Sequence, residues 1–337
     1  MRLIRASLLA AVGMLLPGSA AAEPGCVTQC KTLEKGGELA ANVSLEGCYV
    51  RVCQREGRRL YAEGEYAKAL ESLDFLFDKL DASPSYLLDL GLTFYALDRF
   101  DDALEAFERV VGGFPRNVRA GAQRAHTLVR LGRYDEAIAQ FEKLRAMPES
   151  EGSFKELDTR SYLQGSIGVV KLIQGDVAGG KKDLIAALKA DGRNKLAATY
   201  LNFVLPYLEA GDLDPEGVRQ LVVAYEELGL RRLADAAEHL KQLLIDHPRY
   251  VPGYQRLAEI LRSYEQYEAC EEALKVAEAH LPRNIDLRAE RLRCTLLRVG
   301  PATEAAAPAL AELRDLRRTH PQNERVQHIL TAVGFPP

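Results

Sequence analysis

GRYDEAIAQFEKL, from Gly132 to Leu144, is the third copy of a pattern that recurs along the chain at a constant interval. DRFDDALEAFERV begins 34 residues earlier, at Asp98, and GEYAKALESLDFL begins another 34 residues earlier, at Gly64. In each copy the apolar residues are three and four positions apart, which is the spacing of one face of an α-helix. A second amphipathic stretch precedes each copy. A fixed period that holds two helices predicts an all-α solenoid of stacked helix–turn–helix units.

Small and large residues alternate at defined places in these copies. Ala69, Ala103 and Ala137 occupy the same position in successive copies, where the two helices of a unit are expected to cross closely. Phe107 and Phe141 follow four residues later and are expected to fill the groove toward the next unit.

This arrangement resembles the tetratricopeptide repeat family, which has small residues at two crossing points, an aromatic residue entering the second helix and a proline near the end of each unit. Pro115, Pro248 and Pro282 stand at that last position. The resemblance covers most of residues 50–333, and the expected units start near residues 50, 84, 118, 161, 217, 251 and 285. The fourth unit is a weak match, because GDVAGGKKDL places glycines where bulky residues are usual. An insertion from Met147 to Leu157 precedes it and is expected to form a surface loop.

The repeat loses its phase once, between the fourth and fifth units. Asn194 to Ala210 is expected to be a single apolar helix without a partner in register, although it contains Pro206. Asp214 and Pro215 then provide an N-cap and a first-turn proline for the next helix. The predicted domains are a signal peptide at 1–22, an N-terminal helical cap at 23–49, a first solenoid of about four repeats plus a capping helix at 50–211, and a second of about three repeats plus a C-terminal cap at 214–337. One continuous superhelix of seven units is the alternative.

The first residues have the composition of an export signal. Two arginines precede Ala6 to Leu16, an apolar run that is too short to span a bilayer. Small residues then favour cleavage before Glu23, so we expect a protein exported by the general secretory route to the periplasm or beyond. Lipid anchoring at Cys26 is the less favoured alternative, because the preceding Glu-Pro-Gly is a poor match to lipoprotein signals.

Four of the six cysteines lie at the start of the expected mature chain, at Cys26, Cys30, Cys48 and Cys53. Two antiparallel helices would bring the two pairs together, and an oxidising compartment favours disulfides over a zinc site or a redox-active pair. Cys26–Cys53 with Cys30–Cys48 is the simplest pairing, although four cysteines allow three connectivities. The interpretation is a disulfide-bonded helical hairpin that caps the first repeat.

The remaining two cysteines, Cys270 and Cys294, lie on successive expected helices. Cys270 takes the small crossing position of its unit. We therefore expect Cys270 to be a buried free thiol. A disulfide between Cys270 and Cys294 is the alternative.

No catalytic or cofactor motif is visible along the chain. The six histidines are scattered, and the glutamate cluster at 268, 271 and 272 is interpreted as a solvated helix face. The formal net charge of −4 does not indicate a nucleic-acid-binding protein. We therefore expect no enzyme, no metal and no cofactor.

The resemblance implies a protein-interaction scaffold whose first helices line a concave groove. The first helices of units one to three carry a net charge of +4 and the second helices −5, which favours an acidic or aromatic-bearing protein segment as the ligand. Residues at the groove-facing positions of the family are Arg51, Gln54, Arg58, Tyr61, Leu88, Leu92, Tyr95, Arg119, His126 and Arg130.

The carboxylate clamp of some family members is not expected, because Gln54 and Arg58 replace its Lys and Asn and because Asp89 is nearby. We expect a role in cell-envelope assembly or secretion. The alternative is an accessory subunit of an exported enzyme complex, in which the partner supplies the catalysis.

Overall fold

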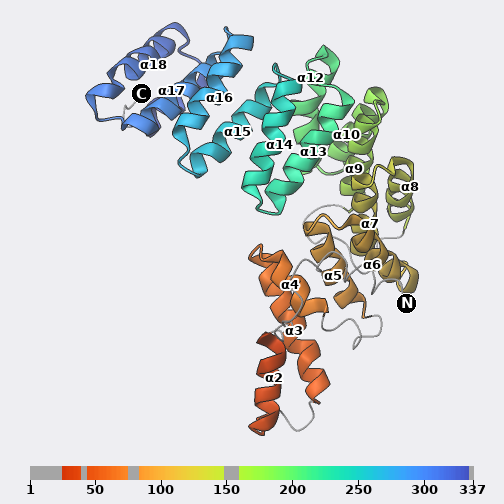
Figure 1. The fold of residues 1–337 in the computed structure, drawn as a ribbon. Helices are drawn as coiled ribbons and strands as arrows, with labels where there is room; N and C mark the ends of the chain where they lie inside the picture. Colours follow the sequence, from red (N-terminus) through yellow and green to blue (C-terminus); the bar gives the residue numbers. More distant parts are fainter. Residues whose placement is uncertain (1–24, 39–43, 75–82, 148–158, 334–337) are drawn as a thin grey trace. The chain divides into compact units, whose positions relative to one another are not determined.

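The computed structural model describes residues 25–38, 44–74, 83–147 and 159–333. Contacts between Cα atoms divide the chain into two compact units, which meet in sequence between Phe114 and Pro115. Each unit is built from helix pairs, and the described residues contain no strand (Figure 1). None of the helices in these ranges combines the length and apolar character that a membrane crossing requires.

The first unit contains five described helices. They are α2 (Gly25–Lys35), α3 (Leu45–Ala62), α4 (Tyr66–Asp74), α5 (Pro84–Ala96) and α6 (Phe100–Gly113). Helix α3 packs against α2 on its N-terminal part and against α4 as the first repeat, and α5 packs against α6 as the second. The close crossing in the second repeat depends on Gly91, because a Cβ there would lie 2.6 Å from the Phe107 ring. Phe107 therefore fills space within its own repeat.

The N-terminal hairpin is bonded as the simplest pairing predicted. Cys26 is joined to Cys53 and Cys30 to Cys48, with Cα–Cα distances of 5.1 and 5.9 Å. The Ser44 hydroxyl accepts a hydrogen bond from the Gly47 amide at 3.0 Å and so caps the start of α3. One helix thus carries two cysteines and then becomes the first helix of the first repeat, so the expected boundary at residues 49 and 50 falls inside α3.

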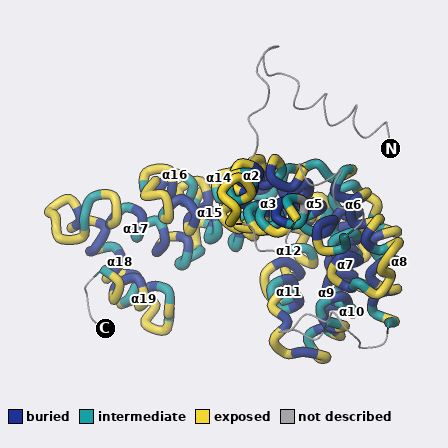
Figure 2. The backbone as a smooth tube through the Cα atoms, turned by 90° about the horizontal axis from the view of Figure 1, so that it is seen from below, coloured by how far each residue is buried: buried dark blue, intermediate teal, exposed yellow. Residues whose placement is uncertain are grey.

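The second unit is also built from paired helices, and a helical segment at residues 195–210 lies in sequence between two sets of pairs. Its helices are α7 (Val118–Arg130), α8 (Tyr134–Arg145), α9 (Thr159–Ile173), α10 (Val177–Ala190), α11 (Lys195–Thr199), the π-helix η1 (Tyr200–Val204), α12 (Leu205–Ala210), α13 (Pro215–Gly229), α14 (Leu233–Asp246), α15 (Val251–Ser263), α16 (Tyr267–His280), α17 (Ile285–Val299), the 3₁₀ turn η2 (Glu304–Ala306), α18 (Ala307–Thr319) and α19 (Glu324–Ala332). Helix α9 is buried over most of its length, whereas α8 and α10 each expose one face (Figure 2). Except for Met147, the expected surface loop at 147–157 lies outside the described residues.

The expected single helix from Asn194 to Ala210 is confirmed in its bounds, because helical residues run without interruption from Lys195 to Ala210 and Asn194 is the N-cap. Its winding is not uniform: the segment consists of α11, η1 and α12, with the π-helical turn just before Pro206. Proline has no amide hydrogen and its ring clashes with the carbonyl four residues earlier, so the regular ladder cannot continue through it. The Leu205 amide instead donates to the Tyr200 carbonyl, five residues back. Helix α10 packs against all three pieces.

The glycines of the fourth repeat have a packing reason. A Cβ on Gly168 of α9 would lie 3.0 Å from the Gly180 carbonyl oxygen, and a Cβ on Gly180 of α10 would lie 2.9 Å from the Gly168 oxygen. The two backbones therefore approach more closely than any side chain at these positions would permit. The bulky residues usual in this family are absent because backbone occupies their place.

The sixth and seventh repeats are joined covalently and by ion pairs. Cys270 of α16 is bonded to Cys294 of α17, so the expectation of a free thiol is wrong. Both cysteines are fully buried at the crossing of the two helices, where their small size allows a Cα–Cα distance of 6.1 Å.

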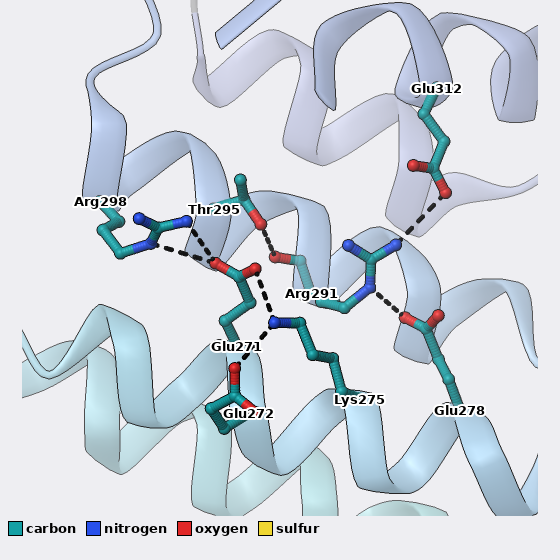
Figure 3. A network of polar contacts seen from close by, with 8 residues as sticks. All are labelled: Glu271, Glu272, Lys275, Glu278, Arg291, Thr295, Arg298 and Glu312. Atoms are coloured by element: carbon teal, nitrogen blue, oxygen red, sulfur yellow. Dashed lines mark hydrogen bonds and ion pairs between the residues drawn. The ribbon is translucent and has the colours of Figure 1, made fainter. Parts of the chain in front are cut away.

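Charged residues also link α17 to α16 and to α18 (Figure 3). Glu271 of α16 pairs with Arg298 of α17 at 3.0 Å and with Lys275 at 3.3 Å. Burial raises the pKa of Glu271, but hydrogen bonds from Arg298 and Lys275 outweigh it and hold the pKa below its ordinary value. Arg291 binds Glu278 at 2.6 Å and Glu312 of α18 at 3.3 Å. The interpretation of Glu271 as part of a solvated face is therefore wrong, because it bridges two repeats.

Candidate functional site: a groove on the first helices

The predicted groove residues of the first unit lie on α3 and α5 and are largely engaged within that unit. Asp89 accepts hydrogen bonds from Gln54 at 2.7 Å and from Arg58 at 2.6 Å. Arg58 is half exposed, with 53% of its side chain accessible, whereas Asp89 is only 15% accessible. Asp89, one of the residues that argued against a carboxylate clamp, thus neutralises Arg58.

The other predicted residues of this unit differ in exposure. Leu88 and Tyr95 are buried, Leu92 and Tyr61 are intermediate, and Arg51 is exposed. Tyr61 and Tyr95 each make an edge-to-face contact with the aromatic residue that begins the second helix of the repeat, at ring distances of 5.2 and 5.3 Å. Each of these two tyrosines therefore holds the two helices of its own repeat together, which restricts what it can offer to a ligand.

The three predicted residues on α7 belong to the second unit. Arg119 is exposed. Arg130 binds Glu226 of α13 at 2.7 Å, and both side chains are mostly buried. This pair links the third repeat to the fifth, so Arg130 has a structural partner inside the unit.

His126 lies against Phe141 and Tyr162. Its Nε2 is 2.6 Å from the Tyr162 hydroxyl, and its ring meets Phe141 edge to face at 5.2 Å. Burial lowers the pKa of His126 to about 4 and raises the pKa of Tyr162 to about 12. Both side chains are therefore neutral at neutral pH.

His126 forms part of the wall of a pocket of about 470 Å³, which we call the central pocket. Its lining is mostly apolar and comes mainly from first helices and from α11 and η1. The lining residues are His126, Val129, Phe141, Ser166, Val169, Val170, Ile173, Lys195, Leu196, Thr199, Tyr200, Val222, Tyr225, Glu226 and Arg256. A concave apolar pocket with a few polar groups at its edge is the usual form of a binding site.

A second pocket of about 710 Å³, which we call the arginine pocket, shares Thr199, Tyr225 and Arg256 with the first. Its lining combines four arginines and two glutamates with aromatic and apolar side chains. The lining residues are Thr199, Phe203, Tyr225, Pro252, Gln255, Arg256, Glu259, Arg262, Ser263, Tyr267, Glu290, Arg293, Leu297 and Arg325. The two pockets therefore adjoin at these three residues.

The π-helical turn contributes to both pockets. Tyr200 lines the central pocket, Phe203 lines the arginine pocket, and Thr199 at the end of α11 lines both. Phe203 is 51% exposed although it belongs to an apolar segment. The π-helical turn therefore lies beside both pockets, as π-helical turns often lie beside functional sites.

Sequence reasoning placed the groove on first helices but limited it to units one to three. It missed the arginine pocket, whose Arg256, Arg262 and Arg293 lie on α15 and α17, the first helices of later repeats. Applying the same rule to every unit would have found these three residues. Phe203 lies outside this rule, because it belongs to the π-helical turn and not to a first helix.

Models of the tetratricopeptide repeat match residues 55–120 and residues 94–148. The two matches overlap and together span residues 55–148. Proteins with this repeat generally mediate protein–protein interaction and are typically non-catalytic. The described residues also bring no group of three or more His, Cys, Asp or Glu side chains to a place where they could hold a metal ion.

Similarity to individual proteins is low. Hsp70-Hsp90 organizing protein 3 of Arabidopsis thaliana is 21% identical over 292 residues, which are 82% of this chain and 50% of that protein. The chain thus spans about half the length of the curated relative it matches. A tetratricopeptide repeat protein of Parabacteroides merdae is 13% identical with a TM-score of 0.39, over 85% of this chain and 98% of that one. PilW, a widely conserved type IV pilus biogenesis factor, is 15% identical with a TM-score of 0.37, and the match covers 83% of this chain and 97% of that one.

Proposed function

We propose that the protein is an exported, non-catalytic scaffold that binds a segment of a partner protein in the groove on its first helices. The observation that carries this proposal is the central pocket: several first helices and the π-helical turn converge on one apolar concavity. Solenoids of this kind use such surfaces to hold extended or helical segments. The export signal expected at residues 1–22 would bring the protein to the cell envelope, and the proposed role in envelope assembly or secretion rests on analogy with exported proteins of similar build.

Export is supported by three disulfides, since such bonds persist in oxidising compartments. Expression of the whole chain in a Gram-negative host tests this part. We expect a periplasmic protein that starts at Glu23 and has no alkylatable thiol before reduction. A full-length cytoplasmic product, or a lipid-modified Cys26, would show that the assigned route is incorrect.

The groove residues predicted on α3, α5 and α7 remain part of the proposal, but charge reversal is a poor test of them. Arg58 and Arg130 are paired with Asp89 and Glu226, so their reversal to glutamate would place like charges together inside the fold. A loss of binding in such variants would not separate ligand contact from structural damage. The central pocket permits a cleaner test.

A photoreactive benzoylphenylalanine at position 222 tests the site directly. Val222 lines the central pocket and is only partly buried, whereas Val276 is 53% exposed on the second helix α16 and serves as the control position. We expect irradiation in the periplasm to attach a discrete protein to position 222 and none to position 276. Equal labelling at both positions, or none at 222, would overturn the proposal. A catalytic protein in the adduct would favour an accessory subunit of an enzyme complex.

A further inference from the structure

The arginine pocket contains a buried carboxylate surrounded by arginines. Glu290 of α17 has 2% of its side chain accessible and binds Arg262 of α15 at 2.7 Å. Its other oxygen lies 3.1 Å from Arg325 of α19 and 3.9 Å from Arg293. That oxygen accepts no hydrogen bond of regular geometry from the described residues.

Charge in this pocket is unbalanced. Three arginines lie around the single carboxylate of Glu290, and Arg256 binds Glu259 at 2.6 Å. The lining therefore has four arginines and two carboxylates, which is a net charge of +2. Burial lowers the pKa of Arg262, and the neighbouring Arg293 and Arg325 lower it further against the opposing effect of Glu290. Another anion would therefore be stabilised here.

Two of the three arginines around Glu290 can reach a ligand. Arg262 is only 14% accessible, but Arg293 is 27% and Arg325 39% accessible. Exposed Phe203 and Leu297 lie in the same lining, so the anion is expected on a chain that also carries apolar groups. Arginine forks hold carboxylates with two parallel hydrogen bonds, which suits this site to glutamate and aspartate side chains.

We infer that the arginine pocket receives the carboxylates of an acidic polypeptide segment, with Arg293 and Arg325 as their partners, while the adjoining central pocket receives an apolar side chain of the same segment. This inference rests on the proposed function and assigns the chemistry of its ligand. It also assigns Glu290 a second role, because this carboxylate holds the arginines in place and competes with the ligand for them.

A defined peptide tests the inference. The probe is a fluorescein-labelled dodecapeptide, amidated at its carboxyl end, with two leucines followed by four glutamates among glycines and serines. Two control peptides replace the glutamates with lysines or the leucines with serines. Fluorescence anisotropy with the full-length protein is expected to show binding of the probe that weakens as salt is added, with both control peptides weaker by about tenfold or more. Binding of the leucine-free peptide or of single-stranded DNA as tightly as the probe would overturn the inference, and so would no binding of the probe.

Protein variants locate the subsite. Arg293→Ala with Arg325→Ala is expected to weaken binding of the probe by about tenfold or more. Arg219→Ala with Arg318→Ala removes the same charge from exposed ion pairs on α13 and α18 and should change binding less than about twofold. Circular dichroism confirms that each variant is folded. Equal effects of the two double substitutions would reduce the site to general electrostatic attraction and contradict the assignment.

Glu290→Gln should strengthen binding of the probe and lower the stability of the protein. The amide keeps the shape of Glu290 but frees Arg293 and Arg325, so the probe should bind several-fold more tightly while the melting temperature falls. A purely structural glutamate would lower stability without improving binding.

Val222→Asp separates the two proposals. Loss of binding in Val222→Asp with unchanged binding in the arginine variants would leave the scaffold function standing and remove the acidic subsite. Unchanged binding in both would contradict the central pocket as well.

Discussion

Among the described residues, three other than glycine adopt a left-handed backbone at one recurring turn. Asp98, Arg231 and Glu265 have φ values of 57°, 58° and 57°, each between the first and second helix of a repeat. In other repeats Gly64 and Gly132 hold this position, with φ values of 83° and 73°. The repeat imposes this conformation whatever residue occupies the position, and side chains with a Cβ adopt it at a cost of roughly 1 kcal/mol.

Glycine at these turns should therefore stabilise the protein. We expect Arg231→Gly and Glu265→Gly each to raise the free energy of unfolding by up to about 1 kcal/mol, since the strain disappears. Ala269→Gly, on the exposed face of α16, should lower it by about 1 kcal/mol, because glycine there only loses helix propensity. Thermal melts of the three variants check this. A loss of stability in all three would mean that the left-handed turn carries no strain.

His126 should make the second unit sensitive to acid. Its pKa of about 4 in the folded protein lies below the ordinary value of 6.5, so the folded chain binds fewer protons than the unfolded chain between these pH values. The contribution of neutral His126 to the free energy of unfolding is complete above pH 6.5 and is lost as the pH falls toward 4. The loss is on the order of 3 kcal/mol. His126→Gln should flatten the dependence of melting temperature on pH in this window. His239→Gln on the exposed face of α14 should keep the original slope, and a matching change in both variants would contradict the assignment to His126.

The helix pairs could be predicted from the sequence because periodicity and length determine them locally. The first helices α5, α7, α15 and α17 begin within a residue of the predicted unit starts at 84, 118, 251 and 285. Contacts between distant residues could not be predicted in this way. Whether Glu271 faces solvent or Arg298, and whether Cys270 meets Cys294, depends on how one repeat is placed on the next. The π-helical turn before Pro206 had a local signal, because a proline inside an expected helix disturbs the regular hydrogen-bond ladder.

The close approach of α9 and α10 should tolerate no added carbon. We expect Gly168→Ala to lower stability by about 2 kcal/mol, because the new Cβ meets the Gly180 carbonyl and the Leu184 backbone and neither can rotate away. Gly229→Ala is the control: the end of α13 has open space around this glycine, and alanine is the better helix former, so stability should stay unchanged or rise. Urea titrations compare the two. Equal stability of both variants would show that the backbones can separate without cost.

At the scale of the whole molecule, the predicted seam at residues 211–215 stays a prediction. Across it, α9 packs against α13, Arg130 binds Glu226, and the central pocket draws residues from both sides. Fragments 23–211 and 214–337 should each be helical, as two solenoids require, but should melt several degrees below the intact protein, because the cut exposes the apolar wall of the pocket. Aggregation of both fragments would favour one continuous superhelix. Melting temperatures equal to that of the intact protein would mean that the interface contributes nothing.

The central claim is that first helices, and not second helices, receive the partner. Exposed apolar residues report on both surfaces: Phe203 and Leu297 lie in the groove, whereas Ile245 and Val276 lie on the second helices α14 and α16 and are 71% and 53% exposed. Hydroxyl-radical footprinting of the full-length protein, alone and with the partner captured through position 222, measures the oxidation of each. We predict that the partner protects Phe203 and Leu297 and leaves Ile245 and Val276 unchanged. Protection of Ile245 and Val276 with undiminished oxidation of Phe203 and Leu297 would contradict the claim.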